Sequence, residues 1–342
     1  MRDPKISDKA IQDFSQRMHP INVLTHHPLH SYTTYRLGGP ADIFVVANTT
    51  EILIKSIKTA KELNIPVYIL GGGSNVLISD TGYRGLVVKN ELSGIRIAGI
   101  KGSNLGKPLQ ERGATVKTVF LTVESGVGLN RLVRYTLDQG LKGLETFLGQ
   151  PGSVGGAVYM NAHSQNAHTF IGDYVLQSLL LNQKGELRIV DAKWFQFNYD
   201  FSRVQKTDDL IVSVTFRLEE DNASNLWKIA QQAFEYRSNT QPTGVRCAGC
   251  VFKNISKADA MRLATPNYTK SAGYLIEHAG LKEKSVGGAS VSSKHANFIT
   301  LKADATASDV IQLIKLIVST VKKRYLITLH PEIVLVGDFP NG

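Results

Sequence analysis

The chain has 342 residues, of which 42% are hydrophobic and 20% charged, a composition typical of a globular protein with more than one domain. No apolar run approaches the ~18 residues of a membrane-spanning helix, and the N-terminal segment lacks the apolar core of a signal peptide, so we expect a cytoplasmic protein without membrane insertion. The formal net charge is +10, but the basic residues are dispersed, which disfavours nucleic acid as a partner and favours either an ordinary basic surface or attraction for a small anionic substrate.

The first predicted unit lies near the N-terminus. Apolar patterning predicts a strand over Ala41–Val46, a helix over about Thr50–Leu63 and a second strand over Pro66–Leu70. This order is that of a βαβ unit. The second strand leads into GGGSN at 71–75, and the VLI after it predicts another strand rather than a helix, which disfavours a Rossmann dinucleotide site.

Two glycine-rich segments follow one another along the chain. In GGGSN, the glycines allow the backbone to approach a ligand and to aim several N–H groups at one point, which suits a pyrophosphate. A helix capped by Asn130 and ended by Gly140 precedes the second segment, GQPGSVGGA at 149–157. One such segment is also typical of an ordinary tight turn, but two in this order predict the two walls of one cofactor cleft.

The region from about 220 to 325 has a different pattern. It is predicted to begin with a helix over 222–237 and to end with an amphipathic helix that carries Val310, Ile314 and Val321 on one stripe. We interpret this region as a separate α+β substrate domain. The tail LITLHPEIVLVGDF predicts a strand that returns to the earlier body, and residues 100–117 predict an extended surface hairpin.

The two cysteines, Cys247 and Cys250, stand in RCAGCVFKN with C-x-x-C spacing. A closed zinc site needs four ligands, and the later histidines His278 and His295 stand alone, so zinc is disfavoured and we expect no metal. A redox dithiol normally begins a helix, whereas VFKN predicts an extended segment. From the residues alone, a buried cysteine that packs as a small apolar side chain remains open.

Seven motifs in order carry a resemblance to a known family: YRLGGPAD, ILGGGSNVLI, GLETFLGQPGSVGGAVYMNA, AGCVFKN, SAGYLIEHAGLK, KHANF and HPEIVLVG. Together they resemble the UDP-N-acetylenolpyruvoylglucosamine reductases, in the branch that lacks an extra tyrosine-bearing loop, and the resemblance runs from about Thr33 to Gly337.

The resemblance implies an α+β protein with a vanillyl-alcohol-oxidase-type (PCMH-type) FAD-binding body of two α/β subdomains and an α+β substrate-binding domain. The subdomains are expected over residues 1–90 and 91–220, the substrate domain over 221–325, and a strand that returns to the body over 326–342.

The resemblance also implies a function. FAD and NADPH are the expected cofactors, and the expected reaction reduces UDP-N-acetylglucosamine enolpyruvate to UDP-N-acetylmuramate for peptidoglycan synthesis. The expected partner is the UDP-sugar alone, and the protein is expected to be a monomer. Two alternatives remain: a related FAD-binding oxidoreductase with another substrate, and a catalytically idle nucleotide-binding homologue.

Matching the motifs residue by residue implies roles for individual side chains. Cys250 falls on the family's proton donor and Glu332 on its glutamate, which would polarise the reacting centre. The FAD pyrophosphate would lie against Gly71, Gly72, Gly73, Ser74 and Asn75. The other side of the cofactor would meet Gly152, Ser153, Gly155, Gly156, Ala157 and Asn161. The UDP-sugar would contact Arg237, Lys253, Asn254, Tyr274 and Lys282.

The sequence departs from the family pattern at three places. Asp200 stands where an arginine that steadies the enolate is expected, and we hypothesise that Arg203 takes over that role. Thr240 replaces the lysine of R-x-x-K-Q-P. NAHSQN replaces the usual NAGAY after the second glycine segment, which places His163 near the cofactor or facing water.

Overall fold

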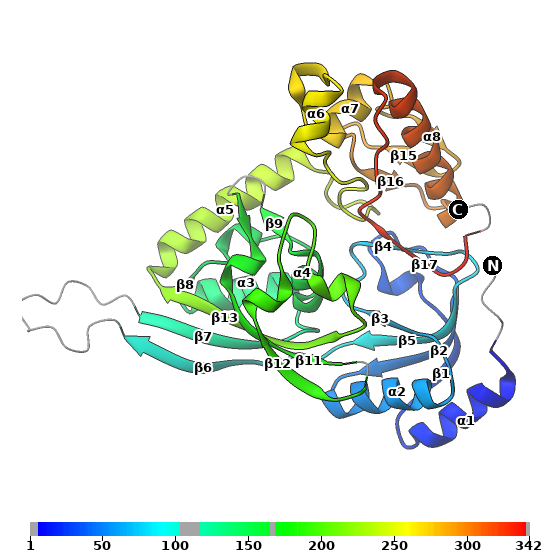
Figure 1. Ribbon diagram of the computed structural model, residues 1–342, viewed down its shortest axis with the longest axis vertical. Coiled ribbons are helices and arrows are strands. Elements are labelled where there is room, and N and C mark those ends of the chain that lie inside the picture. Colours follow the sequence, from blue (N-terminus) through cyan, green and yellow to red (C-terminus); the bar gives the residue numbers. More distant parts are fainter. Residues whose placement is uncertain (1–5, 103–116, 165–167, 183, 340–342) are drawn as a thin grey trace, which may run out of the picture.

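The structure, a computed structural model, describes residues 6–102, 117–164, 168–182 and 184–339. Two sheets with their helices form a body, and the C-terminal part of the chain, coloured yellow to red, lies above it in Figure 1. The predicted surface hairpin at 100–117 falls largely on residues 103–116, outside the described residues. Short 3₁₀ segments connect the elements: His30–Tyr32, Glu145–Phe147, Ile171–Tyr174, Ala192–Phe195, Arg203–Lys206 and Pro266–Tyr268.

The N-terminal sheet has the strand order β1-β2-β5-β3, with β2, β5 and β3 parallel and β1 antiparallel to β2. The helices α1 and α2 cover one face (Figure 1). The predicted helix and its two flanking strands are confirmed, but β5 separates β2 from β3. The bounds are α1 Asp8–Met18, β1 Leu24–Pro28, β2 Pro40–Ala47, α2 Thr50–Glu62, β3 Val67–Leu70, β4 Val76–Ile78 and β5 Tyr83–Asn90.

The second sheet is antiparallel, in the order β12-β11-β13-β7-β6, with β8 paired to β13. Its core includes residues of α3, α4 and α5. These elements are β6 Ile95–Gly102, β7 Lys117–Glu124, α3 Leu129–Asp138, β8 Leu141–Lys142, α4 Val154–Met160, β11 Val175–Leu181, β12 Leu187–Asp191, β13 Leu210–Glu220 and α5 Ala223–Thr240. Beside it lies a small hairpin, β9 His163–Ser164 with β10 Thr169–Phe170.

One predicted helix cap is wrong. The residue before α3 is Gly128, not Asn130, and its backbone begins the helix without a side-chain cap. The side chain of Asn130 instead accepts a hydrogen bond from the backbone N–H of Gly149 at 3.0 Å. Asn130 therefore ties the first turn of α3 to the start of the second glycine-rich segment.

The C-terminal part is reached through α5, which leads from the body toward it in Figure 1. Its core is the buried stripe of the longest helix, α8, which includes Val310, Ile314, Ile317 and Val321. Its elements are α6 Lys257–Arg262, α7 Ala272–His278, β14 Ser285–Val286, β15 Ala289–Val291, β16 Ile299–Leu301 and α8 Ala307–Tyr325. After α8 the chain descends, and β17 (Val334–Val336) pairs in parallel with β4 of the N-terminal region.

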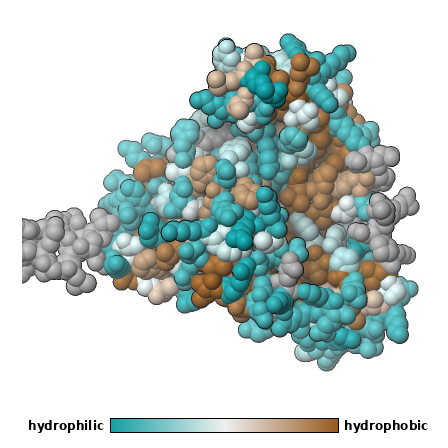
Figure 2. Space-filling view, in the orientation of Figure 1, coloured by the Kyte–Doolittle hydropathy of each residue, from teal (hydrophilic) through white to brown (hydrophobic). Residues whose placement is uncertain are grey.

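The surface is hydrophilic over most of the face seen in Figure 2, and hydrophobic residues gather where the C-terminal part meets the body, near β16 and β17. Within the described part of the chain, no helix is both long and apolar enough to cross a membrane.

Arg246 joins the C-terminal part to the N-terminal region. Its guanidinium donates hydrogen bonds to the backbone carbonyls of Tyr35 and Arg36, at 2.9 Å each, and of Lys302 and Ala303. Hydrogen bonds of a charged group contribute about 1.5–3 kcal/mol. We expect Arg246→Ala to lower the apparent melting temperature by several degrees.

The matched control for this prediction is Arg262→Ala. Among the described residues, the guanidinium of Arg262 pairs only with Asp259, and its side chain is 67% exposed, so its loss is expected to change stability by about 0.5 kcal/mol or less. Differential scanning fluorimetry of both variants checks the expectation. Equal melting temperatures would show that the four carbonyl contacts of Arg246 do not stabilise the junction.

Candidate active site

A large cavity of about 1020 Å³ lies where the two sheets meet the C-terminal part. It is lined by both glycine-rich segments, by α4, by the turn at 199–200 and by residues of the C-terminal part. Ligand pockets usually measure about 300–1,000 Å³, so this cavity is large enough for a large ligand.

The two glycine-rich segments touch one another. A Cβ atom added at Gly72 would lie 2.5 Å from the Cα of Gly152, and one added at Gly71 would lie 2.5 Å from the Oγ of Ser153. Gly73 has φ +64, and an added Cβ would lie 2.0 Å from a backbone oxygen of Tyr32. The absence of side chains here is what lets the segments form adjacent walls of the same cavity.

The predicted cofactor contacts gather at this cavity. All five residues from Gly71 to Asn75 line it. Of the second segment, Gly152, Ser153, Gly155, Gly156 and Ala157 line it as well. Ser153 begins α4, and its Oγ accepts a hydrogen bond from the backbone N–H of Gly156 at 3.3 Å. A flat dinucleotide suits this surface, because the glycines let the two backbones approach one another closely and leave the wall without their side chains.

Asn161 does not line the cavity, unlike the rest of the predicted cofactor set. It is buried, ends α4 with φ +50, and uses both ends of its amide within the protein. Its Nδ2 donates to the carbonyl of Asn198 at 2.8 Å, and its Oδ1 accepts from the N–H of Gly172 at 3.1 Å. Asn161 thus fixes the turn that carries Asp200 rather than facing the cavity.

Cys250 lines the cavity from the C-terminal part and is half-buried. The backbone on its C-terminal side is tightly held. The N–H of Val251 donates to the carbonyl of Asn297, and the Asn297 amide makes two hydrogen bonds with the backbone of Phe252, at 2.9 and 2.8 Å. The N–H of Glu332 donates to the carbonyl of Val251, which brings Glu332 beside the thiol.

Burial is the main reason why the pKa of the Cys250 thiol lies well above its ordinary value. The negative charges of Glu332 and Asp200 raise this pKa further, whereas Arg237 and a hydrogen bond from Asn297 lower it. Cys250 therefore keeps its proton at neutral pH. Once the proton has left, the positive charge of Arg237 would stabilise the remaining thiolate.

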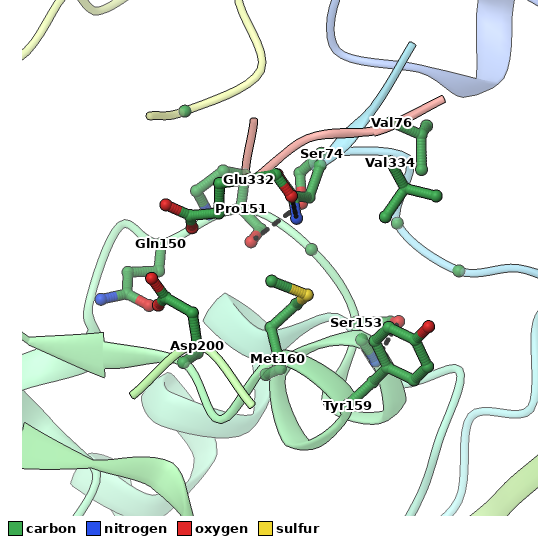
Figure 3. A pocket seen from close by; sticks show the side chains of 18 of the residues that line it. Ser74, Val76, Gln150, Pro151, Ser153, Tyr159, Met160, Asp200, Glu332 and Val334 are labelled. Carbon is green, nitrogen blue, oxygen red and sulfur yellow. Dashed lines mark hydrogen bonds between the residues drawn. The ribbon is translucent and has the colours of Figure 1, made fainter. Parts of the chain in front are cut away.

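Glu332 and Asp200 face one another across the cavity (Figure 3). Burial and then the charge of Asp200 raise the pKa of Glu332 to about 8, while Lys253 acts in the opposite direction. At pH 7 this carboxyl group is therefore largely protonated. A neutral carboxyl group offers an O–H donor where an ordinary glutamate would offer only acceptors.

Two of the predicted substrate residues line the cavity. Arg237 is held by a hydrogen bond from its Nη1 to the Oε1 of Gln241 at 3.0 Å, and burial lowers its pKa. Asn254 accepts a hydrogen bond from the N–H of Ala272 and donates one to the hydroxyl of Tyr199 at 3.1 Å.

The other predicted substrate residues do not line it. Tyr274 stacks on His278, with the ring centroids 3.7 Å apart, and Lys282 pairs with Glu277 at 2.7 Å. The charge of Lys253 lowers the pKa of Glu332.

Arg203 is also absent from the cavity wall. Its side chain is exposed, and its guanidinium lies 5.0 Å from the ring centroid of Trp194. Arg203 therefore lies away from the cavity, and its position does not support the hypothesis that it replaces the family's arginine.

Several cavity residues were missed by sequence reasoning. Tyr199, Lys270, His295 and Asn297 line the cavity beside Cys250 and Asn254. Tyr199 directly precedes Asp200, and His295 and Asn297 stand in the motif KHANF, so these positions were the available signal. No role followed from it, because tyrosine, histidine and asparagine are common in loops.

Metal binding finds no support in the described part of the chain, where no group of three or more His, Cys, Asp or Glu side chains is arranged to hold an ion. Both cysteines are free thiols, and burial raises the pKa of Cys247 as well.

Comparisons with known proteins agree with this arrangement. Residues 41–191 match the family model of an FAD binding domain, and residues 241–336 match that of the UDP-N-acetylenolpyruvoylglucosamine reductase C-terminal domain. A UDP-N-acetylenolpyruvoylglucosamine reductase of Halalkalibacterium halodurans is 34% identical over 92% of this chain and 95% of its own. One of Bacillus subtilis is 32% identical over 96% and 99%.

The fold has a solved counterpart. The crystal structure of UDP-N-acetylenolpyruvylglucosamine reductase from Thermus caldophilus covers 92% of this chain and 98% of its own, with a TM-score of 0.69 and 26% identity. The predicted fold, an FAD-binding body with an α+β substrate domain, is confirmed. This chain belongs to the UDP-N-acetylenolpyruvoylglucosamine reductase family.

Proposed function

We propose that this chain is an NADPH-dependent flavoenzyme that reduces UDP-N-acetylglucosamine enolpyruvate to UDP-N-acetylmuramate, a step of peptidoglycan synthesis. One observation carries the proposal: the two glycine-rich segments, Cys250 and Glu332 line a single cavity. The proposed enzyme is a cytoplasmic monomer with a UDP-sugar as its substrate. Family membership and the matched FAD-binding domain support the same reaction.

FAD, when bound, would supply the redox chemistry, the relay of a hydride from NADPH to the terminal carbon of the enolpyruvyl group. The protein supplies the matching proton. Cys250 gives its S–H proton to the neighbouring carbon, so that one hydride and one proton are added across the double bond. The thiolate that remains is steadied by Arg237, whose charge lowers the pKa of Cys250, and then regains a proton from water.

The remaining polar groups of the cavity orient the substrate. Asn254 has its Oδ1 and one Nδ2 hydrogen engaged with protein groups, which fixes the amide and leaves a second Nδ2 hydrogen for a ligand. Lys270 and Arg237 bring positive charge to the cavity wall, which suits a diphosphate and a carboxylate. Tyr274 and Lys282 remain predicted substrate contacts.

A related FAD-binding oxidoreductase with another substrate is the second candidate, because of two observations. Asp200 places a carboxylate where the family pattern has an arginine. The hydroxyl of Thr240 is turned back onto its own helix, where it donates to the carbonyl of Tyr236 at 2.8 Å, so this position offers the substrate no cation.

Absorbance of the purified protein tests the proposal. We expect a yellow protein with a flavin band near ~450 nm that NADPH bleaches without air. Reoxidation by the enolpyruvyl UDP-sugar, with UDP-N-acetylmuramate formed in equal amount, identifies the reductase. A protein bleached by NADPH but not reoxidised by that sugar is an oxidoreductase of another substrate, and a colourless protein that binds no added FAD is the idle homologue.

A further inference from the structure

Two of the departures from the family pattern meet in space. His163 follows the second glycine-rich segment and Asp200 lies 37 positions later, yet Nδ1 of His163 and Oδ1 of Asp200 are 3.4 Å apart. Both residues line the cavity. Their side chains are 19% and 3% exposed, so the contact is largely shielded from solvent.

Asp200 is held in place by its backbone. It is a central residue of a tight turn in which Asn198 and Phe201 exchange two backbone hydrogen bonds, and it has φ +48. The side chain of Gln205 donates to its carbonyl at 3.1 Å. A non-glycine residue in this conformation costs free energy that the surrounding contacts must offset, and the hydrogen bonds of the turn hold the backbone of Asp200 in place.

The second carboxylate oxygen of Asp200 lacks a partner. Oδ2 is fully buried and makes no hydrogen bond to any described residue. Burying an acceptor without a partner costs about 1–3 kcal/mol. Figure 3 shows the Asp200 carboxylate pointing into the cavity toward Glu332, so the partner expected for Oδ2 is a proton donor on that side.

The ring of His163 is fixed between neighbours. It packs against Phe170 and Tyr199, at 5.5 and 5.1 Å between ring centroids. Its backbone pairs with Phe170 in the β9–β10 hairpin and accepts a hydrogen bond from Nε2 of Gln150 at 2.9 Å. The imidazole is therefore set against Asp200 rather than free to turn to solvent.

The titratable groups beside Glu332 come from two segments. Asp200 and Tyr199 lie on the turn, and Cys250 and Lys253 lie on the segment after the C-x-x-C motif. Two buried carboxyl groups at one site favour a state in which they share one proton. Lys253 opposes this effect but does not cancel it, since the pKa of Glu332 stays at about 8.

We propose that His163 is a positioning residue of this site: it holds Asp200 so that the free carboxylate oxygen faces Glu332, which keeps Glu332 the proton-bearing carboxyl group of the cavity. This inference rests on the proposed function. The neutral Glu332 donates its O–H to the oxygen on which negative charge develops during reduction, the part that an arginine guanidinium plays in the family pattern. No bond is broken at Glu332, and Cys250 still supplies the proton to carbon.

A pH profile of the single-turnover reoxidation of the reduced holoenzyme by the enolpyruvyl UDP-sugar tests the proposal. The rate is lost as pH rises through the pKa of Glu332, near 8. Asp200→Asn removes the neighbouring negative charge, so the pKa of Glu332 falls and this loss begins at lower pH. His163→Ala releases Asp200 and shifts the profile in the same direction.

His163→Asn is the conservative variant. Its amide N–H lies close to where Nδ1 of the imidazole lies, so it continues to hold Asp200, and we expect a profile like that of the unsubstituted protein. His30→Ala is the control, because His30 is exposed and does not line the cavity. If His163 had a merely structural role, its loss would change the amplitude of the reoxidation reaction or the stability of the protein. It would not shift the pH dependence of the reoxidation rate.

A second measurement needs no turnover. In a Cys247→Ser background, iodoacetamide reacts with the thiolate of Cys250, and Asp200 is one of the charges that raise the pKa of this thiol. At a fixed pH near 9, we expect alkylation of the FAD-loaded protein to become about three- to tenfold faster in Asp200→Asn and in His163→Ala. His163→Asn and Asp304→Asn, an exposed aspartate, are expected to leave the alkylation rate unchanged.

The outcomes separate this inference from the proposed function. If the unsubstituted protein is not reoxidised by the UDP-sugar, the proposed function fails, and the alkylation rates still report on the pair. If the protein turns over normally but His163→Ala keeps both the pH profile and the alkylation rate, the positioning role is wrong. If the pH profile shifts in Asp200→Asn but not in His163→Ala, His163 has no positioning role.

Discussion

Cys250→Ala is expected to slow reoxidation of the reduced flavin by the enolpyruvyl UDP-sugar by about 10²–10⁴-fold, the usual contribution of a positioned general acid. Reduction of the flavin by NADPH is expected to stay within about twofold, because hydride transfer to the cofactor needs no proton from this thiol. The variant should therefore be bleached by NADPH and remain bleached when the sugar is added. Stopped-flow absorbance near ~450 nm measures both half-reactions separately.

The physical reason lies in the surroundings of the thiol. Burial and the carboxyl groups of Glu332 and Asp200 raise the pKa of Cys250, so it is protonated when the reduced flavin and the substrate meet. Arg237 favours the thiolate, which limits the cost of giving that proton away. Alanine deletes the Sγ atom and with it the proton donor, and it leaves the rest of the residue in place.

Two matched variants sharpen this test. Cys247→Ala removes the other thiol of the C-x-x-C motif, which does not line the cavity, and we expect both half-reactions to be unchanged. Cys250→Ser keeps a proton donor at the same place and should retain part of the activity. Equal reoxidation rates in Cys250→Ala and the unsubstituted protein would end the assignment of Cys250 as the acid.

The sequence predicted the parts of the site whose chemistry depends on the backbone. The glycines at 71–73 and at 152, 155 and 156 could be interpreted from the sequence because few roles require so many residues without side chains. The two segments do meet, at Gly72 and Gly152. The helices at 50–62 and 307–325 could be predicted for a different reason, because the apolar stripe of each helix is a local sequence pattern.

The sequence could not predict which side chains face the cavity. Asn161 lies beside cavity residues in the chain, but its αL backbone turns its amide toward Asn198 and Gly172. The pairing of His163 with Asp200 depends on two loops that come together only in the folded protein. Such contacts leave no periodic pattern in the sequence. His163 and Asp200 could therefore be noticed as departures from the family pattern, but not recognised as partners.

Gly72→Ala is expected to abolish retention of FAD through purification and to weaken its binding by about 100-fold or more. The added methyl group would lie 2.5 Å from the Cα and 2.6 Å from the carbonyl carbon of Gly152. Carbon atoms pack at about 3.5–4.0 Å, so the two segments must separate by about 1 Å. Both neighbours are backbone, and neither can turn aside as a flexible side chain would.

Gly99→Ala is the control for this last prediction. An added Cβ at Gly99 would meet only a ring carbon of Phe120 at 3.6 Å, an ordinary contact, and this residue does not line the cavity. FAD that binds only the folded state raises the melting temperature, and this rise grows with the ratio of free FAD to its Kd. We expect FAD to raise the melting temperature of Gly99→Ala but not that of Gly72→Ala. Circular dichroism should show that both apoproteins are folded. A full rise in folded Gly72→Ala would mean that the close approach of the two glycine-rich segments does not form the cofactor cradle, and the proposed function would lose the observation that carries it.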